Sequence, residues 1–482
     1  MNQINGSKVF NNFIWRFLER IGAQGVTFIV SIVLARILDP GVYGTIALVL
    51  VFTSILQVFV DSGLGNALIQ KKDADDLDFS SVFFFNLITC ISMYLLMFII
   101  SPYIAAFYKM PELTPLIRVL SLTLIVSGVK NIQQAYVSRN LLFKNFFYAT
   151  LGGTIGAAII GIWMALNGMG VWSLVAQNLL NVTVDTIILW LTVKWRPKLM
   201  FSFKRLKGLL SYGWKLLASE LLDTGYNNLR ALIIGKLYTA DDLAYYNRGQ
   251  QFPNLFVSNI NISISSVLLP TMSAEQDDRS RVRSMTCRAI TTSTYLMMPL
   301  MMGLAVCAEP IVRIILTEKW IPCVFYLRIF CFEYAFYPVH TANLNAIKAM
   351  GRSDLFLKLE VKKKILGLAV LFSTMFISVR AMALSLVFTS LLSQIINSRP
   401  NSYLLDYKYI DQVRDMLPSI GLSCLMGAVV YPVSLLHLND VLTLLIQVPL
   451  GAVVYICGSI AFKTDSFYYL TGIIKGYFVR KK

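Results

Sequence analysis

The residues best suited to chemistry in this chain are charged side chains set within otherwise apolar segments. Between residues 209 and 236, Glu220, Asp223 and Arg230 follow one another at intervals of three and seven residues. A helix with about 3.6 residues per turn places all three on one face. Lys215 precedes them in the same segment. Charges at membrane depth usually face a bundle interior or a wet cavity, so this segment is predicted to line one.

The first apolar segment, residues 12–36, carries a similar stripe. Arg16, Arg20 and Gln24 recur every four residues and therefore share a helix face. Glu19 follows Arg16 by three residues and is a predicted partner for it. Both arginines lie within about 6–13 Å of the segment's first end at about 1.5 Å per residue. Snorkelling of the two side chains to the lipid surface is therefore an alternative to lining a cavity.

Two more segments join this polar set, because Asp61 lies in residues 43–66 and Arg248 lies in residues 241–269. The bases in the interiors of the four polar segments are Arg16, Arg20, Lys215, Arg230 and Arg248. Guanidinium groups bind phosphate through two parallel hydrogen bonds, so these segments predict a cavity for an anionic ligand. Asp185, alone in its segment, is expected to be a structural hydrogen-bond partner instead.

No arrangement typical of catalysis or of a resident cofactor is found. The seven cysteines form no CxxC pair, and only His340 and His437 could complete a metal site. The glycine-bearing stretches "GTIGAAIIG" and "NGMGVWS" have no Walker lysine and instead favour close helix packing. The chain is therefore expected not to be an enzyme and to bind no metal, cofactor or nucleotide.

The polar segments belong to a chain that is 56% hydrophobic and only 14% charged, whereas soluble domains are about 25% charged. A spanning helix needs about 20 mostly apolar residues, and fourteen blocks meet that requirement. Their predicted ranges are 12–36, 43–66, 80–107, 114–135, 146–167, 171–193, 209–236, 241–269, 289–316, 322–347, 362–379, 381–398, 416–437 and 441–461. The predicted fold class is thus an all-α polytopic membrane protein with about 14 transmembrane helices.

The distribution of basic residues predicts the orientation of these helices. When the N-terminus is placed in the cytoplasm, about two-thirds of the 43 Lys and Arg residues fall in cytoplasmic segments and about a sixth fall on the other side. Both termini are therefore expected to be cytoplasmic. The net charge of +17 is explained by this orientation, so no nucleic-acid partner is expected.

A weak internal repeat divides the chain. "SIVLARI" at 31–37 aligns with "ALIIGKL" at 231–237, and Arg36 falls on Lys236. The repeat predicts two pseudo-symmetric six-helix lobes in parallel orientation, as in many transporters. The expected domains are an N-terminal lobe at 1–195, a C-terminal lobe at 209–398, an extra helix pair at 416–461 and a basic cytoplasmic tail at 462–482.

Two stretches carry a resemblance to a known family. Residues 34–88 begin "LARILDPGVYG" and continue "DSGLGNALIQ" before an acidic loop. Residues 233–255, "IIGKLYTADDLAYYNRGQQFPNL", resemble the matching segment of a second half, with Ala244 where glycine is usual. Both are similar to bacterial polysaccharide repeat-unit flippases of the Wzx or colanic-acid-exporter type. Those flippases belong to the multidrug/oligosaccharidyl-lipid/polysaccharide exporter superfamily.

The resemblance implies two lobes around a cationic cavity, alternating access, and a terminal helix pair that helps to form a groove for a lipid tail. The implied substrate is an undecaprenyl-pyrophosphate-linked oligosaccharide, moved from the cytoplasmic to the periplasmic leaflet of the bacterial inner membrane for surface polysaccharide assembly. Membrane lipids and the polysaccharide polymerase machinery are the other expected partners. The cavity residues that we expect are Arg16, Arg20, Gln24, Asp61, Lys215, Glu220, Asp223, Arg230 and Arg248.

Two other functions are weighed against this one. A cation-coupled multidrug-type exporter of small molecules would need a more acidic cavity, and the bases named above count against it. A polymerase or ligase of surface polysaccharide would need a large periplasmic loop, whereas the longest predicted loop on that side has about ten residues.

Overall fold

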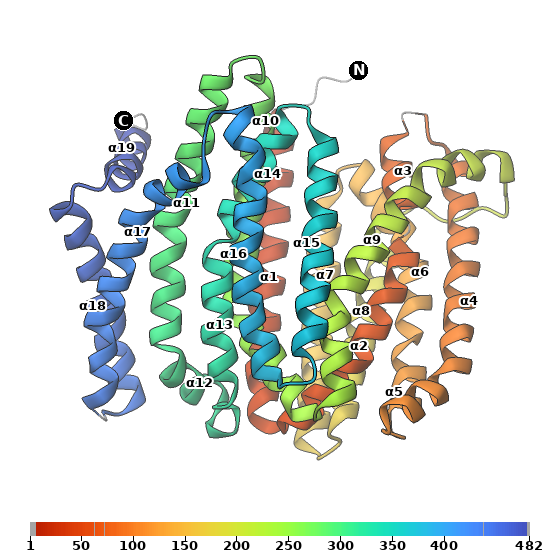
Figure 1. The fold of residues 1–482 in the computed structure, drawn as a ribbon. Helices are drawn as coiled ribbons and strands as arrows, with labels where there is room; N and C mark the ends of the chain where they lie inside the picture. The colour runs from red at the N-terminus through yellow and green to blue at the C-terminus, as the bar shows by residue number, and fades with distance from the viewer. Residues whose placement is uncertain (1–5, 62, 72, 437, 480–482) are drawn as a thin grey trace. The chain divides into compact units, whose positions relative to one another are not determined.

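The structure is a computed structural model that describes residues 6–61, 63–71, 73–436 and 438–479, and every element in these ranges is helical (Figure 1). The chain forms two compact units, Met1–Ala244 and Tyr245–Lys482, called here the N-terminal and the C-terminal unit. The helices of the first unit are α1 (Gly6–Ile37), α2 (Pro40–Asp61), α3 (Leu64–Gln70), α4 (Asp76–Tyr108), α5 (Leu113–Leu120), α6 (Leu122–Arg139), α7 (Phe143–Leu166), α8 (Val171–Thr192) and α9 (Phe203–Leu237).

Helix α10 (Ala240–Ala274) begins in the N-terminal unit and continues into the C-terminal one. The remaining elements are α11 (Arg279–Val306), α12 (Ala308–Leu316), η1 (Glu318–Trp320), α13 (Cys323–Ala335), α14 (Tyr337–Ala349), α15 (Ser353–Thr374), α16 (Val379–Leu404), α17 (Tyr409–Val430), η2 (Tyr431–Leu436), α18 (Asp440–Ala461) and α19 (Asp465–Val479).

Each of the fourteen predicted segments is helical, and within the described ranges 11 runs of helix are long and apolar enough to cross a membrane. The chain is therefore a multi-pass membrane protein. The runs that do not qualify include α9 and α15, whose stretches 203–237 and 353–374 are rich in charge, and the pair α13 and α14, each of only 13 residues. The count of fourteen spans stays a prediction.

Several predicted segments are broken where local chemistry interrupts a helix. Gly63 has a φ of 67°, a left-handed conformation that glycine adopts at little cost, and it separates α2 from α3. Pro338 lies in the first turn of α14, where its missing N–H costs no hydrogen bond, and α13 ends shortly before it. The predicted ranges 43–66 and 322–347 thus each contain two helices.

The predicted tail, 462–482, contains the helix α19. Phe467 and Leu470, three residues apart on one helix face, pack against a core cluster that includes Tyr295 of α11 and Leu422 of α17. These apolar contacts therefore stabilise the segment as a helix on the C-terminal unit. The basic composition of 462–482 predicts a cytoplasmic tail but does not predict this helix.

Close packing of α7 on α8 organises one side of the N-terminal unit. A Cβ atom on Gly153 would lie 2.8 Å from the carbonyl oxygen of Asn181, and one on Gly161 would lie 3.1 Å from Cβ of Gln177. Only glycine allows such backbone approach, as in other small-residue helix interfaces in membranes. The glycines of "GTIGAAIIG" thus have the packing role that the sequence indicated.

A network of charges and aromatic rings attaches the segment between α8 and α9 to the start of α4. Asp78 is fully buried, and its Oδ2 atom lies 2.7 Å from Lys71 Nζ and 3.4 Å from Arg205 Nη1. The Asp78 backbone N–H and the Arg205 guanidinium hold the pKa of Asp75 below its usual range. Trp195 stacks on Tyr136 with ring centroids 6.0 Å apart. We call this set, Lys71, Asp75, Asp76, Asp78, Trp195, Lys198 and Arg205, the linker network.

Buried amides connect three helices of the C-terminal unit. Asn343 on α14 donates a hydrogen bond of 2.9 Å to Gln412 on α17 and accepts one of 2.6 Å from Asn401 on α16. All three side chains are buried. Buried amide groups are costly unless they are paired, so these bonds favour one register of the three helices over shifted ones.

Candidate functional site

The acid predicted on α2 lies at the end of that helix within a set of hydrogen bonds. Asn131 on α6 donates from Nδ2 to Oδ1 of Asp61 at 3.1 Å and to the carbonyl oxygen of Val60 at 3.0 Å. Gln57 Nε2 lies 3.4 Å from the same Asp61 oxygen. The Asp61 side chain is nonetheless exposed, so its carboxylate is oriented by amides while it can still meet a ligand or solvent.

Two charged neighbours complete the surroundings of Asp61. Its carboxylate interacts electrostatically with Glu220 on α9 and with Lys130 on α6. Lys130 itself forms an ion pair of 3.0 Å with Asp185 on α8, and both of these side chains are largely buried. The expectation that Asp185 is a structural partner is confirmed. Lys130 was not among the predicted cavity residues, yet it is the base that α6 brings near Asp61 and Glu220.

The residues predicted on α1 lie elsewhere in the N-terminal unit, because α1 packs against α7. Arg20 is exposed and Gln24 is half-buried. Glu19 accepts a hydrogen bond of 3.3 Å from Thr150 on α7. The side chain of Arg16 lies outside the described residues, so its predicted pairing with Glu19 stays a prediction.

The predicted stripe on α9 reaches the surface of the N-terminal unit. Glu220 and Asp223 are exposed and Arg230 is half-buried, whereas the side chain of Lys215 lies outside the described residues. Helix α9 packs against α2, α3 and α4. The spacing of Glu220 and Asp223 on one helix face therefore agrees with the exposure of both side chains.

Arg248 is the predicted residue that belongs to the C-terminal unit. Only 5% of it is exposed. Its Nη1 atom donates a hydrogen bond of 2.6 Å to Oε1 of Gln251, and its guanidinium carbon lies 5.0 Å from the centre of the Trp320 ring. Both contacts partly offset the cost of burying this cation. The arrangement differs from that of Arg20, whose charge is accessible at the surface.

A small cavity of about 290 Å³ lies inside the N-terminal unit beside Gly235 and Lys236, which belong to the second copy of the sequence repeat. It is lined by Gly44 of α2, Tyr108 of α4 and Lys236 of α9, among others. Lys236 Nζ donates a hydrogen bond to the carbonyl oxygen of Phe107 and lies 3.9 Å from the centre of that ring. Its cation is thus used in packing, which gives one residue of the repeat a structural role.

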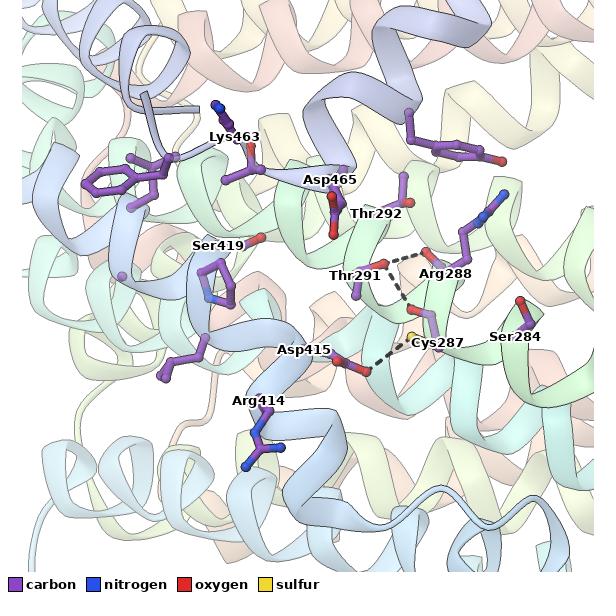
Figure 2. Close-up of a pocket in the computed structure, with 18 of the residues that line it drawn as sticks. Ser284, Cys287, Arg288, Thr291, Thr292, Arg414, Asp415, Ser419, Lys463 and Asp465 are labelled. Carbon is purple, nitrogen blue, oxygen red and sulfur yellow. Dashed lines mark hydrogen bonds between the residues drawn. The ribbon is translucent and has the colours of Figure 1, made fainter. Parts of the chain in front are cut away.

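A larger cavity of about 1240 Å³ lies inside the C-terminal unit, between α11, α17 and the turn that joins α18 to α19 (Figure 2). Its lining bases are Arg283, Arg288, Arg414 and Lys463. The sequence indicated these four only as markers of orientation. They come from three separate segments, so no motif or spacing could have joined them, and only the packing of α11 against α17 does so.

Residues 33–325, more than half of the chain, match the family described as polysaccharide biosynthesis protein. The chain is 26% identical over 318 residues to the succinoglycan biosynthesis transport protein ExoT of Rhizobium meliloti (strain 1021). The aligned region covers 66% of this chain and 64% of ExoT, so this chain spans slightly less than two-thirds of that relative. It is 24% identical over 366 residues to the lipopolysaccharide biosynthesis protein WzxC of Escherichia coli (strain K12), covering 74% and 73% of the two chains.

Among solved structures, the chain superposes on the lipid II flippase MurJ in an inward closed conformation with a TM-score of 0.75. The match covers 95% of this chain and 99% of MurJ at 16% identity, which shows a shared fold. This fold agrees with the many apolar helices described above. On the family match, this chain belongs to the polysaccharide biosynthesis protein family.

Proposed function

We propose that this protein is a flippase for an undecaprenyl-pyrophosphate-linked oligosaccharide. It moves the substrate from the cytoplasmic to the periplasmic leaflet by alternating access, for the assembly of a surface polysaccharide. The observation that carries the proposal is the family match over residues 33–325 together with a MurJ-like fold over 95% of the chain. ExoT is named for succinoglycan biosynthesis and WzxC for lipopolysaccharide biosynthesis, and both names support a polysaccharide precursor as the substrate.

The chemistry of such a substrate suits the polar residues described above. Sugars and a pyrophosphate cannot cross hydrocarbon unaided, because burying polar and charged groups without partners is costly. The polyprenyl tail can stay in lipid throughout. The protein therefore needs an accessible polar surface for the head group and no covalent chemistry. Charges of both signs are supplied by exposed Arg20 and Asp61 and by the stripe of α9, where Glu220 and Asp223 are exposed and Arg230 is half-buried.

The finer organisation is part of the same proposal. Fourteen spans form two six-helix lobes and a terminal pair, both termini are cytoplasmic, and the protein resides in the bacterial inner membrane. The predicted cavity residues Arg16, Arg20, Gln24, Asp61, Lys215, Glu220, Asp223, Arg230 and Arg248 are proposed to contact the head group or to shape its cavity. The polysaccharide polymerase is proposed as a partner that takes up the product.

Deletion of the gene tests the function. We expect lipid-linked oligosaccharide to accumulate at the cytoplasmic face and surface polysaccharide to be lost, because the head group would have no path across the bilayer. Mass spectrometry of extracted lipids and staining of the surface polymer would measure both. Unchanged lipid and polymer levels, with a rise in drug sensitivity instead, would favour the alternative of a cation-coupled multidrug-type exporter.

Arg20→Ala tests whether this accessible base binds the head group. Loss of one charge-assisted hydrogen bond costs about 1.5–3 kcal/mol, so complementation of the deletion strain is expected to need at least about tenfold more protein. Arg20→Lys should be intermediate, because lysine keeps the charge but not the bidentate geometry. Lys207→Ala, which removes an exposed base from the first turns of α9, is the matched control. Normal complementation by Arg20→Ala at normal membrane levels would show that Arg20 snorkels to lipid.

A further inference from the structure

The 1240 Å³ cavity of the C-terminal unit has a polar region formed by three elements (Figure 2). Helix α11 provides Arg283 and Arg288, α17 provides Arg414 and Asp415, and the turn after α18 provides Lys463. The volume exceeds that of most small-molecule pockets, which is about 300–1,000 Å³. A ligand with both a head group and the root of a chain would fit such a space.

Bases exceed acids among the residues that line this cavity, by four to two. Of the acids, Asp415 is engaged, because its Oδ2 atom accepts hydrogen bonds from the Tyr407 hydroxyl at 2.5 Å and from Cys287 Sγ at 3.2 Å. Asp465 is the other lining acid. Asp406, which lies outside the lining, is 3.6 Å from Arg283 and offsets one of these bases, and the remaining positive charge makes the cavity complementary to an anion.

The four bases differ in how they are held. Arg288 lies over the ring of Tyr469 with 4.5 Å between its guanidinium carbon and the ring centre, and Arg283 lies 3.6 Å from Asp406. Arg414 and Lys463 are exposed, and within the described part of the chain neither has a side-chain hydrogen bond or ion pair. These two cations can therefore turn to a ligand without breaking an existing bond.

Apolar side chains continue from the polar region along the outside of the unit. Leu417, Leu425 and Phe462 line the cavity and are also exposed by 59%, 45% and 68%. Further along α18, Ile456 and Ile460 are about half exposed. A basic region that opens onto an exposed apolar face matches an amphiphile whose phosphate lies in the cavity and whose chain lies along the helices.

We propose that this cavity binds the diphosphate and the first isoprene units of the polyprenyl-linked substrate in the cytoplasmic leaflet, as a docking site outside the predicted cavity residues. The proposal rests on the function proposed above and on the predicted orientation, which places Arg283, Arg414 and Lys463 on the cytoplasmic side. A diphosphate diester carries two negative charges, one for each of the exposed cations Arg414 and Lys463, whereas a glycerophospholipid diester carries one. Arginine fork geometry suits the phosphate oxygens.

The charge test uses the double variant Arg414→Gln/Lys463→Gln of the full-length protein, purified in detergent. Native mass spectrometry measures binding of undecaprenyl diphosphate and, in a separate series, of phosphatidylglycerol. We expect binding of the diphosphate to weaken at least tenfold while phosphatidylglycerol is affected little. The matched control, Arg399→Gln/Lys408→Gln, removes the same charge from exposed positions on the same predicted side that do not line the cavity, and should bind as the unmodified protein does.

A steric test fills the cavity without changing its charge. Gly421 lines the cavity in α17, and a Cβ atom there meets nothing within 4 Å, so Gly421→Trp places an indole in open space. We expect this variant to lose diphosphate binding to a similar extent. Gly472→Trp, at an equally open glycine of α19 outside the lining, is the control. Thermal unfolding of each variant reports whether the protein remains folded.

Three results would overturn the proposal. Equal diphosphate affinity for both cavity variants and the unmodified protein would exclude the site. A selective loss of phosphatidylglycerol binding would assign the cavity to a bilayer phospholipid. If both cavity variants unfold, the single variant Lys463→Gln replaces them. Diphosphate binding by this variant equal to that of the unmodified protein would also exclude the site. In each case the deletion experiment still decides separately whether the protein is a flippase.

Discussion

Lys130→Met is expected to destabilise the N-terminal unit by about 3–5 kcal/mol, because removal of one partner leaves a buried charge uncompensated. Asp185 is only 7% exposed, and its Oδ2 atom lies 3.0 Å from Lys130 Nζ. Among the described residues, its Oδ1 atom has no hydrogen-bond partner. The lysine is thus the main compensation for this carboxylate, which lies between two helices that are predicted to cross the membrane.

Thermal unfolding in detergent and the amount of protein in the membrane would measure this effect. The double variant Lys130→Met/Asp185→Leu should recover most of the stability, since replacing a buried pair by apolar residues is often neutral. Lys207→Met, at an exposed position, is the control and should change the free energy of unfolding by less than about 0.5 kcal/mol. A single variant as stable as the unmodified protein would show that Asp185 has another source of compensation.

Asp78→Ala is expected to cost about 2–4 kcal/mol, because it removes charge-assisted hydrogen bonds and half of a helix cap at once. The Asp78 carboxylate accepts from Lys71 at 2.7 Å and from the backbone N–H of Asp75 at 3.2 Å. It also lies 3.4 Å from Arg205 Nη1. The expected loss of stability is smaller than that from breaking a fully buried ion pair. The side chains of Lys71 and Arg205 are 27% and 39% exposed, so both can turn to water when Asp78 is removed.

Unfolding followed by circular dichroism would measure the change, together with cleavage by a protease between α8 and α9. Asp73→Ala removes an exposed carboxylate from the same loop and should be nearly neutral. If Asp78→Ala and Asp73→Ala unfold at the same temperature, the linker network contributes less than its geometry indicates.

The helices themselves could be predicted from the sequence, because long apolar blocks and their breaks are local properties. The breaks within blocks were missed. Gly63 and Pro338 end or begin helices inside segments that hydropathy alone joins into one. The helix α19 was also missed, because it is stabilised by packing of Phe467 and Leu470 on other helices and not by a long apolar run.

The candidate site could be predicted only where its residues share one helix. The accessible stripe of Glu220 and Asp223 follows from spacing on α9 alone. The partner of Asp185 could not be found in the same way, since Lys130 lies 55 residues earlier on another helix. The cavity of the C-terminal unit is a stronger example, because its bases come from three segments spread over residues 283–463.

The linker network and the hydrogen bonds beside it also bear on how the chain folds during synthesis. Lys198 N–H and Ser202 N–H donate to the hydroxyls of Ser80 and Ser81, and Trp195 Nε1 donates to Asp76. All of these partners lie more than a hundred residues earlier in the chain. Domains generally fold from the N-terminus during synthesis. The segment after α8 can therefore pack onto the start of α4, which is already inserted, as soon as this segment leaves the ribosome. The N-terminal unit can thus complete its packing while the C-terminal unit is still being translated.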